Sequence, residues 1–306
     1  RSTLFPYTTL FRSALARFDA ARALYATLPD THCIQADCLC NAGDALVAIG
    51  EYAAAADRFD AAFALYATLP DTQQAQTRCL DNAGTALVAI GEYAAAADRF
   101  DAAFALYTSL PDTQQAQATC LHNAGTALKA VGEHAAAADR FDAARDLYAT
   151  LPDTQREQAA CLDNAGNSLE AMGEYAAAAD RFDAAFALYT TLPDTQQAQA
   201  TCLHKAGTAL EAMGEHAAAA ERYDAARALY ATLPDTQQAQ AICLYNAGLA
   251  LAAMGEHATA LERYDAARAL FATLPDTQHD QAACLNKAGT ALYAVGEHAE
   301  IGRAHV

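Results

Sequence analysis

Two sets of apolar residues in the stretch 72–109 have the spacing of a helical face. The first set comprises Leu80, Ala83, Gly84 and Leu87. The second set comprises Tyr93, Ala96, Ala97, Phe100, Ala103 and Leu106. Steps of three and four residues bring side chains onto one side of an α-helix. The pattern therefore predicts two amphipathic helices, over about 72–90 and about 92–109.

The residues around these stretches predict where each helix ends. Gly91 can take the left-handed conformation that commonly closes a helix, and Glu92 favours the N-terminus of the next one. Pro111 stops the second helix, because a proline disfavours helical geometry in the residue before it. We expect Asp112 to cap the following helix, with Gln115 as its capping-box partner.

Gly84 lies in the middle of the first predicted helix, where glycine costs about 0.5–1 kcal/mol relative to alanine. Glycine nevertheless occupies this position in every copy of the repeat described next. We therefore expect a close approach of the second helix, with Gly84 lying against Ala96.

The tripeptide Leu-Pro-Asp returns every 41 residues along the chain. Its leucines are Leu28, Leu69, Leu110, Leu151, Leu192, Leu233 and Leu274. A fixed period of this size is typical of stacked supersecondary units. Because the connections are short, the two helices of each copy should be antiparallel neighbours. The sequence thus predicts an all-α array of helix pairs.

The small and aromatic positions of each copy resemble the tetratricopeptide repeat (TPR). In the second full copy they are Gly84, Gly91, Tyr93, Ala96, Phe100 and Ala103. The resemblance implies a right-handed α-α superhelix, or solenoid, of antiparallel helix pairs. A HEAT or armadillo array, which has repeats of ~40–47 residues, is the alternative, but it offers no reason for the paired glycines.

The copy departs from the usual TPR pattern in sequence and in length. Leu80, Ala83 and Leu87 stand where that family usually has an aromatic residue, a leucine and a tyrosine. Each copy is also longer than the ~34 residues of the standard repeat. In length it resembles the long TPR form of kinesin light chain and of bacterial signalling proteins.

The repeat predicts three segments. Residues 14–299 hold half of a helix pair, six full pairs and a final first helix ending at Ala299. Residues 1–13 and 300–306 match no copy and resemble translated sequencing adapters, so we expect both to be non-native and the chain to be a metagenomic, bacterial fragment. The alternative for residues 1–13, which are rich in Thr and lack acids, is a natural targeting peptide.

The charge balance narrows the class of partner. Asp and Glu total 37 against 19 Lys and Arg, which gives a formal net charge of -18. Without a basic stripe, this disfavours nucleic acid and favours a basic protein partner. No apolar run approaches the roughly 20 residues of a membrane span.

The cysteines could suggest a metal site or disulfides, but their spacing argues against both. Seven share one repeat position: Cys38, Cys79, Cys120, Cys161, Cys202, Cys243 and Cys284. Equivalent positions in stacked helices should lie on the order of 10 Å apart, whereas a disulfide needs Cα atoms within about 7 Å. We expect small buried apolar residues, no metal site, and a cytoplasmic, reducing environment. Cys33, Cys38 and Cys40 lie close in sequence but have no His at ligand spacing.

No nucleophile, phosphate-binding or metalloprotease motif occurs in the chain, so we expect no catalytic activity and no cofactor. The exposed face of the first helices is the more informative surface. One variable repeat position on it holds Cys40, Asp81, His122, Asp163, His204, Tyr245 and Asn286. The adjacent position holds Asn41, Asn82, Asn123, Asn164, Lys205, Asn246 and Lys287.

An amide offers both donors and an acceptor, so the asparagines at Asn41, Asn82, Asn123, Asn164 and Asn246 can pair with a peptide backbone. The TPR resemblance implies that the first helices line the concave side of the superhelix and that asparagines at this position do so. The variable residues Asp81, His122, Asp163, His204 and Tyr245 would then select side chains. The alternative is that each Asn bonds a neighbouring helix end.

The leading functional hypothesis is a protein–protein interaction scaffold that binds an extended, basic peptide segment along the first helices. The alternative is the sensor or regulatory arm of a larger signalling enzyme, such as an NTPase or a caspase-like protease. A third hypothesis is an architectural array that associates end to end through its terminal helices.

Overall fold

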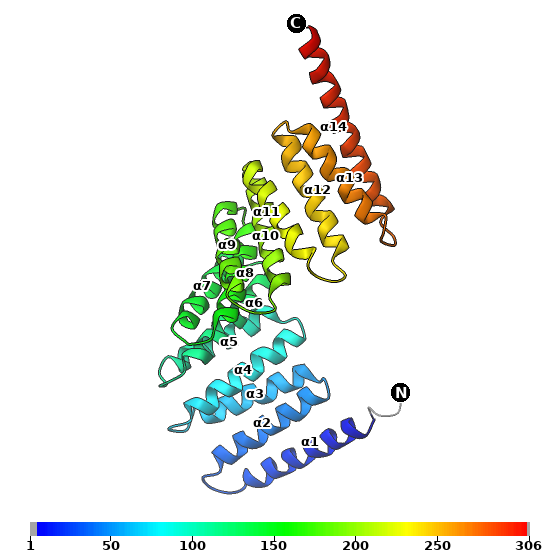
Figure 1. The fold of residues 1–306 in the computed structure, drawn as a ribbon. Helices are drawn as coiled ribbons and strands as arrows, with labels where there is room; N and C mark the ends of the chain where they lie inside the picture. The colour runs from blue at the N-terminus through cyan, green and yellow to red at the C-terminus, as the bar shows by residue number, and fades with distance from the viewer. Residues whose placement is uncertain (1–4, 305–306) are drawn as a thin grey trace. The chain divides into compact units, whose positions relative to one another are not determined.

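The computed structural model describes residues 5–304, with side chains described for residues 7–296 (Figure 1). Fourteen helices and no strands lie in that part of the chain. They divide between two compact units, residues 1–152 and residues 153–306. Unit 1 contains α1 (Phe5–Tyr25), α2 (His32–Ala48), α3 (Tyr52–Tyr66), α4 (Gln73–Ala89), α5 (Tyr93–Tyr107), α6 (Gln114–Val131) and α7 (His134–Ala149). Unit 2 contains α8 (Gln155–Ala171), α9 (Tyr175–Thr190), α10 (Gln196–Ala212), α11 (His216–Tyr230), α12 (Gln237–Ala253), α13 (His257–Phe271) and α14 (Gln278–Ala304).

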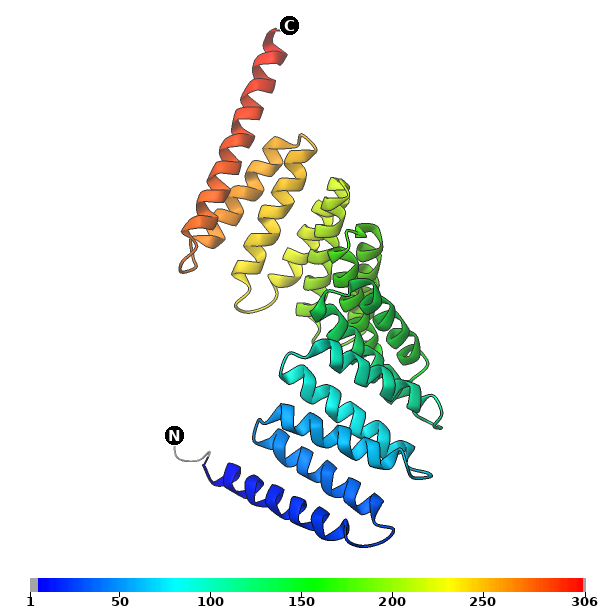
Figure 2. The same ribbon diagram turned by 180° about the vertical axis from the view of Figure 1, so that it is seen from behind.

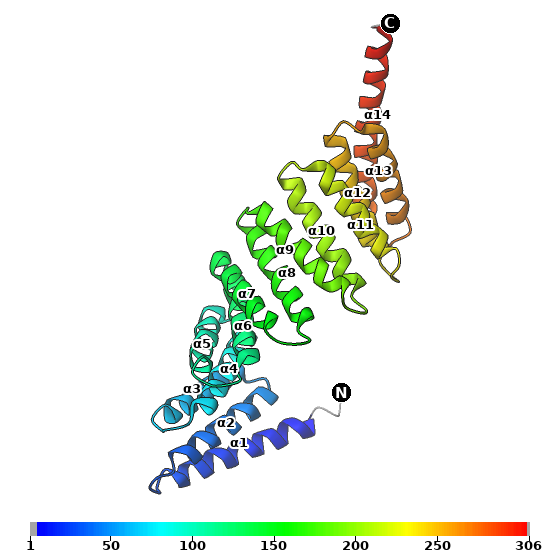
Figure 3. The ribbon, with the colours of Figure 1, turned by 60° about the vertical axis from the view of Figure 1, so that its left-hand side comes forward.

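Within each unit every helix packs against the next one along the chain. Figure 2 shows this for α1 to α4, which lie side by side as successive layers, and Figure 3 shows it for α8, α9 and α10. The first helices of the copies are the even-numbered ones and the second helices are the odd-numbered ones. The predicted all-α class and the stacking of helix pairs are therefore confirmed within each unit.

Small residues and one aromatic ring per copy fill the space between the helices. In unit 2, Phe182 is fully buried between Ala178 and Ala179 of its own helix and Ala206 of the next copy. The seven cysteines at the shared repeat position are buried, as predicted. Burial of alanine faces lets the helix axes come close, and stacking on the next copy completes each core cluster.

The mid-helix glycines make room for this aromatic ring, and not for alanine as the sequence suggested. A Cβ atom added to Gly84 would lie 2.8 Å from Cε1 of Phe100. The expected neighbour, Ala96, is not among the nearest atoms. The ring of Phe100 is larger than a methyl group, so it reaches the backbone of the first helix one turn beyond Ala96. Glycine is retained because any side chain would overlap the ring.

The turn between copies also differs from the prediction. Gly91 takes a φ of 81°, as expected for a helix-closing glycine, but Asp112 takes a left-handed φ of 55° and does not cap α6. Thr113 stands at the cap instead. Its hydroxyl donates to the Tyr107 carbonyl at 2.7 Å and accepts from Gln117 Nε2 at 3.0 Å. The Pro-Asp pair turns the chain so that the threonine reaches the end of the preceding helix, and the proposed Asp112–Gln115 capping box does not form.

The terminal helices are longer than the repeat predicts. Helix α1 runs unbroken from Phe5, and α14 continues through Gly296 to Ala304 instead of ending at Ala299. Gly296 lacks the positive φ of the six other glycines at its repeat position. Those six turn the chain into a second helix, and none follows α14 within the described residues.

Candidate functional site

The exposed side of α2, α4 and α6, here called the first-helix face, carries the variable positions identified in the sequence. On α4, Arg78 and Thr85 are exposed and Asp81 and Asn82 are half-buried. The opposite side of the same helix buries Leu80, Ala83 and Ala86 in the core. The helical period therefore separates packing residues from residues that can meet a ligand.

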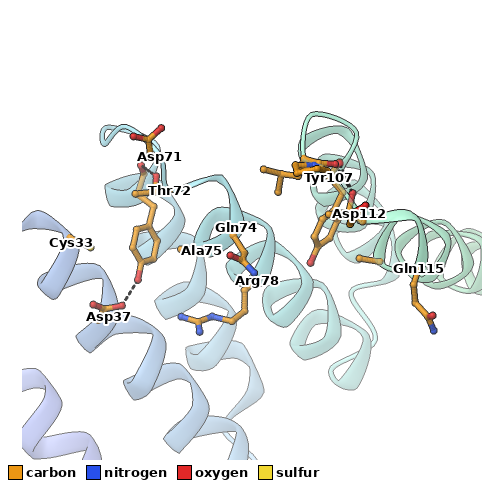
Figure 4. Close-up of a pocket in the computed structure, with 15 residues that line it drawn as sticks. Cys33, Asp37, Asp71, Thr72, Gln74, Ala75, Arg78, Tyr107, Asp112 and Gln115 are labelled. Atoms are coloured by element: carbon orange, nitrogen blue, oxygen red, sulfur yellow. Dashed lines mark hydrogen bonds between the residues drawn. The ribbon is translucent and has the colours of Figure 1, made fainter.

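An open cavity of about 1060 Å³ lies on this face, at the N-terminal halves of α4 and α6 (Figure 4). The first helices contribute Cys33, Asp37, Gln74, Ala75, Arg78, Gln115 and Ala116 to its lining. The remaining lining residues come from the ends of α3 and α5 and the turns after them: Tyr66, Asp71, Thr72, Tyr107, Leu110, Pro111, Asp112 and Thr113. The cavity thus occupies the wedge between successive copies in unit 1.

Two tyrosines that line this wedge donate hydrogen bonds to carboxylates. The Tyr66 hydroxyl donates to Asp37 Oδ1 at 2.5 Å, and the Tyr107 hydroxyl donates to Asp81 Oδ2 at 2.9 Å. Burial raises the pKa of Tyr107 to about 12, and burial followed by the Asp37 hydrogen bond raises the pKa of Tyr66 further. Both phenols therefore stay protonated and act as donors. Figure 4 shows Arg78 extending toward the Asp37 side of the cavity.

The equivalent wedge in unit 2 is also open. A smaller cavity of about 220 Å³ is lined by Ile242, Tyr245, Phe271, His279, Asp280 and Ala283. Ile242 stands four copies after Arg78, and Phe271 stands five copies after Tyr66. The wedge is therefore a recurring feature of the repeat, polar in unit 1 and largely apolar in unit 2.

The predicted asparagines lie on the first helices. In unit 1, Asn41 is exposed and Asn82 and Asn123 are half-buried. None of these three side chains has a hydrogen bond to another residue in the described part of the chain, and the same holds for Asn246 in unit 2. Asn164 differs, because its amide donates to the Ala160 carbonyl of its own helix at 3.1 Å.

The variable position next to these asparagines contacts the following copy. Asp81 accepts a hydrogen bond from the Cys120 thiol at 3.1 Å, and the His204 ring nitrogen Nδ1 lies 3.4 Å from Cys243 Sγ. Burial is the main cause that raises the pKa of Asp81, and the bonds from Cys120 and Tyr107 oppose it. These side chains are therefore partly engaged inside the array.

Asp163 and the aromatic members of this position are also held by neighbours. The Lys205 ammonium donates to both carboxylate oxygens of Asp163, at 2.7 and 2.8 Å. The His122 ring stacks edge-on against Phe141 at 5.4 Å between centroids, and Tyr245 lies 5.8 Å from Tyr264. Of the five predicted selector residues, Tyr245 lines the cavity of unit 2, and none lines the cavity of unit 1.

The thiol–imidazole contact in unit 2 does not have the properties of a nucleophilic pair. Cys243 is 1% exposed, and burial raises its pKa to about 12. Burial, followed by the charge of Lys205, lowers the pKa of His204. Both groups are therefore neutral near pH 7, and the sulfur does not face solvent.

Sequence reasoning missed Asp37, Tyr66 and Tyr107 as lining residues. The two tyrosines close the second helices, one residue beyond the position of Leu106, where the predicted apolar set ends. Asp37 shares its repeat position with Arg78, which the pattern places on the exposed face. Their convergence depends on how successive copies stack, which a one-dimensional pattern does not contain.

Two searches of the described residues gave negative results. They contain no group of three or more His, Cys, Asp or Glu side chains that could hold a metal ion. Among them, no helix combines the length and the apolar character that crossing a membrane would require.

Comparison with known proteins places the fold. No protein-family model matches the chain, and no curated protein matches it. Among solved structures, BtubC (BKLC) from P. vanneervenii is 15% identical with a TM-score of 0.56, over 76% of this chain and 92% of that one. The TPR-like repeats of a putative kinesin light chain from Podospora anserina are 18% identical with a TM-score of 0.54, over 68% of this chain and 100% of that one.

A third similar structure is the apo form of RapI, 10% identical with a TM-score of 0.59, over 92% of this chain and 80% of that one. At these identities the likeness concerns the fold. The chain is a helical repeat array whose fold is similar to that of TPR-like repeat proteins.

Proposed function

We propose that this chain is a protein-interaction scaffold, and that the first-helix face of unit 1 holds an extended segment of another protein. The observation that carries the proposal is the open wedge of about 1060 Å³ on the same face as three asparagines without side-chain partners in the described chain. The TPR-like fold is consistent with this role, because repeat arrays present extended binding surfaces.

The spacing of the asparagines suits an extended backbone. Asn41, Asn82 and Asn123 come from α2, α4 and α6, which are successive first helices. Side chains of successive first helices touch, as Cys40 of α2 and Cys79 of α4 do, so these helices lie on the order of 10 Å apart, and an extended chain advances about 3.3 Å per residue. Each amide would therefore meet roughly every third peptide unit, where it can donate to a carbonyl and accept from an N–H.

The charge of the wedge favours a basic segment. Asp37, Asp71 and Asp112 line the cavity, and Arg78 is the one cation in the lining that the structure describes. The carboxylates of Asp71 and Asp112 are exposed and make no hydrogen bond to another described residue. A Lys or Arg side chain of the bound segment would reach these carboxylates while its backbone meets the asparagines.

The test begins with selection of linear peptides from a random displayed library on the full chain. We expect the selected peptides to be rich in Lys and Arg. Their affinity is then measured by fluorescence anisotropy for the triple variant Asn41→Ala, Asn82→Ala, Asn123→Ala. Each lost hydrogen bond contributes about 1 kcal/mol, so Kd should rise on the order of 100-fold.

The matched control is Asp57→Asn, Asp98→Asn, Asp139→Asn, three exposed residues that also share one repeat position but lie on the second helices. This variant changes net charge without touching the first-helix face, so Kd should change less than about threefold, as expected for screened surface charges. An unchanged Kd in the asparagine variant, an equal loss in both variants, or a library that yields no binder would contradict the proposal.

A further inference from the structure

Two cysteines of unit 1 that occupy different repeat positions lie in contact. Cys40 on α2 and Cys79 on α4 have their sulfur atoms 3.1 Å apart, and both side chains are buried. Cys79 belongs to the position shared by seven cysteines, whereas Cys40 is the one cysteine at the variable position of Asp81. Equivalent positions lie too far apart for disulfides among the seven cysteines, but Cys40 and Cys79 occupy different positions, so that distance does not apply to them.

The register of the repeat explains the contact. The variable position of one copy meets the cysteine position of the next, 39 residues later, as Asp81 meets Cys120 and His204 meets Cys243. Among these contacts, only the one between Cys40 and Cys79 has a thiol at the variable position as well. The pair therefore arises from a general packing rule of the array together with a single residue, Cys40.

We propose that Cys40 and Cys79 form a disulfide that joins α2 to α4 under oxidising conditions and opens under reducing ones. This assigns a covalent modification site in the buried contact between α2 and α4, and it does not depend on the peptide-binding proposal.

The surroundings of Cys40 and Cys79 determine which of the two thiols attacks first in thiol–disulfide exchange. The hydrogen bond from Cys79, with a smaller contribution from the charge of Arg78, lowers the pKa of Cys40. The same hydrogen bond and burial raise the pKa of Cys79. Cys40 lies beside Arg78 and is 4% exposed, against 0% for Cys79, so we assign it as the thiol that attacks first, since the thiolate is the reactive form. Arg78, exposed on α4 and in contact with Cys40, brings a positive charge beside that thiolate.

The reaction balances with an external disulfide such as oxidised glutathione. The Cys40 thiolate attacks one sulfur of that disulfide, which forms a mixed disulfide and releases one glutathione thiolate. Cys79 then loses its proton and attacks Cys40 Sγ, which releases the second glutathione. The two protein thiols are oxidised, one external disulfide is reduced, and the two protein protons end on two glutathione thiols.

The experiment uses the full chain, equilibrated with oxidised or reduced glutathione, quenched by alkylation and digested with trypsin. Cleavage after arginine places Cys33, Cys38 and Cys40 on peptide 23–58 and Cys79 on peptide 79–99. Mass spectrometry of the oxidised chain should show these two peptides linked, with the link lost after reduction. The link should persist in Cys33→Ser and Cys38→Ser and fall at least tenfold in Cys40→Ala.

A variant that gains a disulfide keeps the test informative even if Cys40→Ala fails to fold. Asp81→Cys places a second thiol pair at the same register, with Cys120 as its partner. The packing rule requires a new link between peptides 79–99 and 100–129 in this variant. Absence of the 23–58 to 79–99 link in the oxidised wild-type chain, its persistence in Cys40→Ala, or failure of Asp81→Cys to gain a link would each overturn the proposal.

Discussion

The glycines in the middle of the first helices offer a matched pair of substitutions within unit 2. Gly166 and Gly289 share a repeat position, but their surroundings differ. A Cβ at Gly166 would lie 2.6 Å from Cε1 and 2.9 Å from Cδ1 and Cζ of Phe182, whereas a Cβ at Gly289 would have no neighbour within 4 Å. The same change to alanine therefore probes packing at one site and helix propensity alone at the other.

The expected magnitudes follow from these distances. In both helices, replacing glycine by alanine gains about 1 kcal/mol of helix propensity. At Gly166 the ring of Phe182 is fully buried and cannot move aside, so overpacking costs about 1–3 kcal/mol. We expect Gly166→Ala to lower the free energy of unfolding by about 1 kcal/mol. Gly289→Ala should raise it by about 1 kcal/mol, because no neighbouring atom lies within 4 Å of the added Cβ.

The measurement is urea denaturation followed by circular dichroism, combined with native-state hydrogen exchange of the amides of α8 and α9. Exchange is included because a repeat array need not unfold in one step. Phe182→Leu supplies a double-mutant cycle, since leucine lacks the outer ring atoms that meet the new methyl group. Gly166→Ala should cost less in that background. Equal effects of the two alanine substitutions, or no coupling to Phe182, would refute the packing explanation.

Two further predictions concern the turn and the pH dependence. Asp112→Val should lower the free energy of unfolding by about 1–2 kcal/mol, because a β-branched side chain is disfavoured at a φ of 55°. Urea denaturation measures the loss, and Asp98→Val on the exposed side of α5 is the control. An equal loss in the control would contradict the strain argument. Burial, then the charge of Lys205, lowers the pKa of His204 below its ordinary value of 6.5. The unfolded chain therefore binds the His204 proton more tightly than the folded chain does. As a result, stability is lost as the pH falls through 6.5. Between about pH 7.5 and about pH 5 the wild-type chain should therefore lose more stability than His204→Asn, and parallel pH curves for the two proteins would refute this.

The local elements were predictable because they depend on residues that are close in sequence. The steps between Tyr93, Ala96, Phe100 and Ala103 predicted α5, and Gly91 predicted the end of α4, since helical periodicity and left-handed glycine are properties of a short segment. The cap at Thr113 was not predicted. It depends on the hydroxyl reaching back to the Tyr107 carbonyl across the turn, which the pattern of capping residues does not contain.

The candidate site was predictable only in part. Helical spacing placed Asn41, Asn82 and Asn123 on the exposed side of their helices; in the structure Asn41 is exposed and Asn82 and Asn123 are half-buried. Their role in peptide binding stays a prediction. The wedge beside them was not foreseen, because Tyr66 and Asp37 come from the two helices of one copy, whereas Tyr107 and Asp112 join them in the lining only when the next copy stacks.

By itself, the sequence determined the 41-residue period, the two helices of each copy and the sides on which they are apolar. The tertiary structure decided the register between copies. Packing of one helix pair on the next brings a residue opposite the one 39 positions later, so that Cys40 meets Cys79 and Arg99 pairs with Asp60. This offset of two residues from the period comes from the angle at which curved helix surfaces interlock, and side-chain volume sets that angle. Composition and periodicity do not contain this register, because they describe each copy alone.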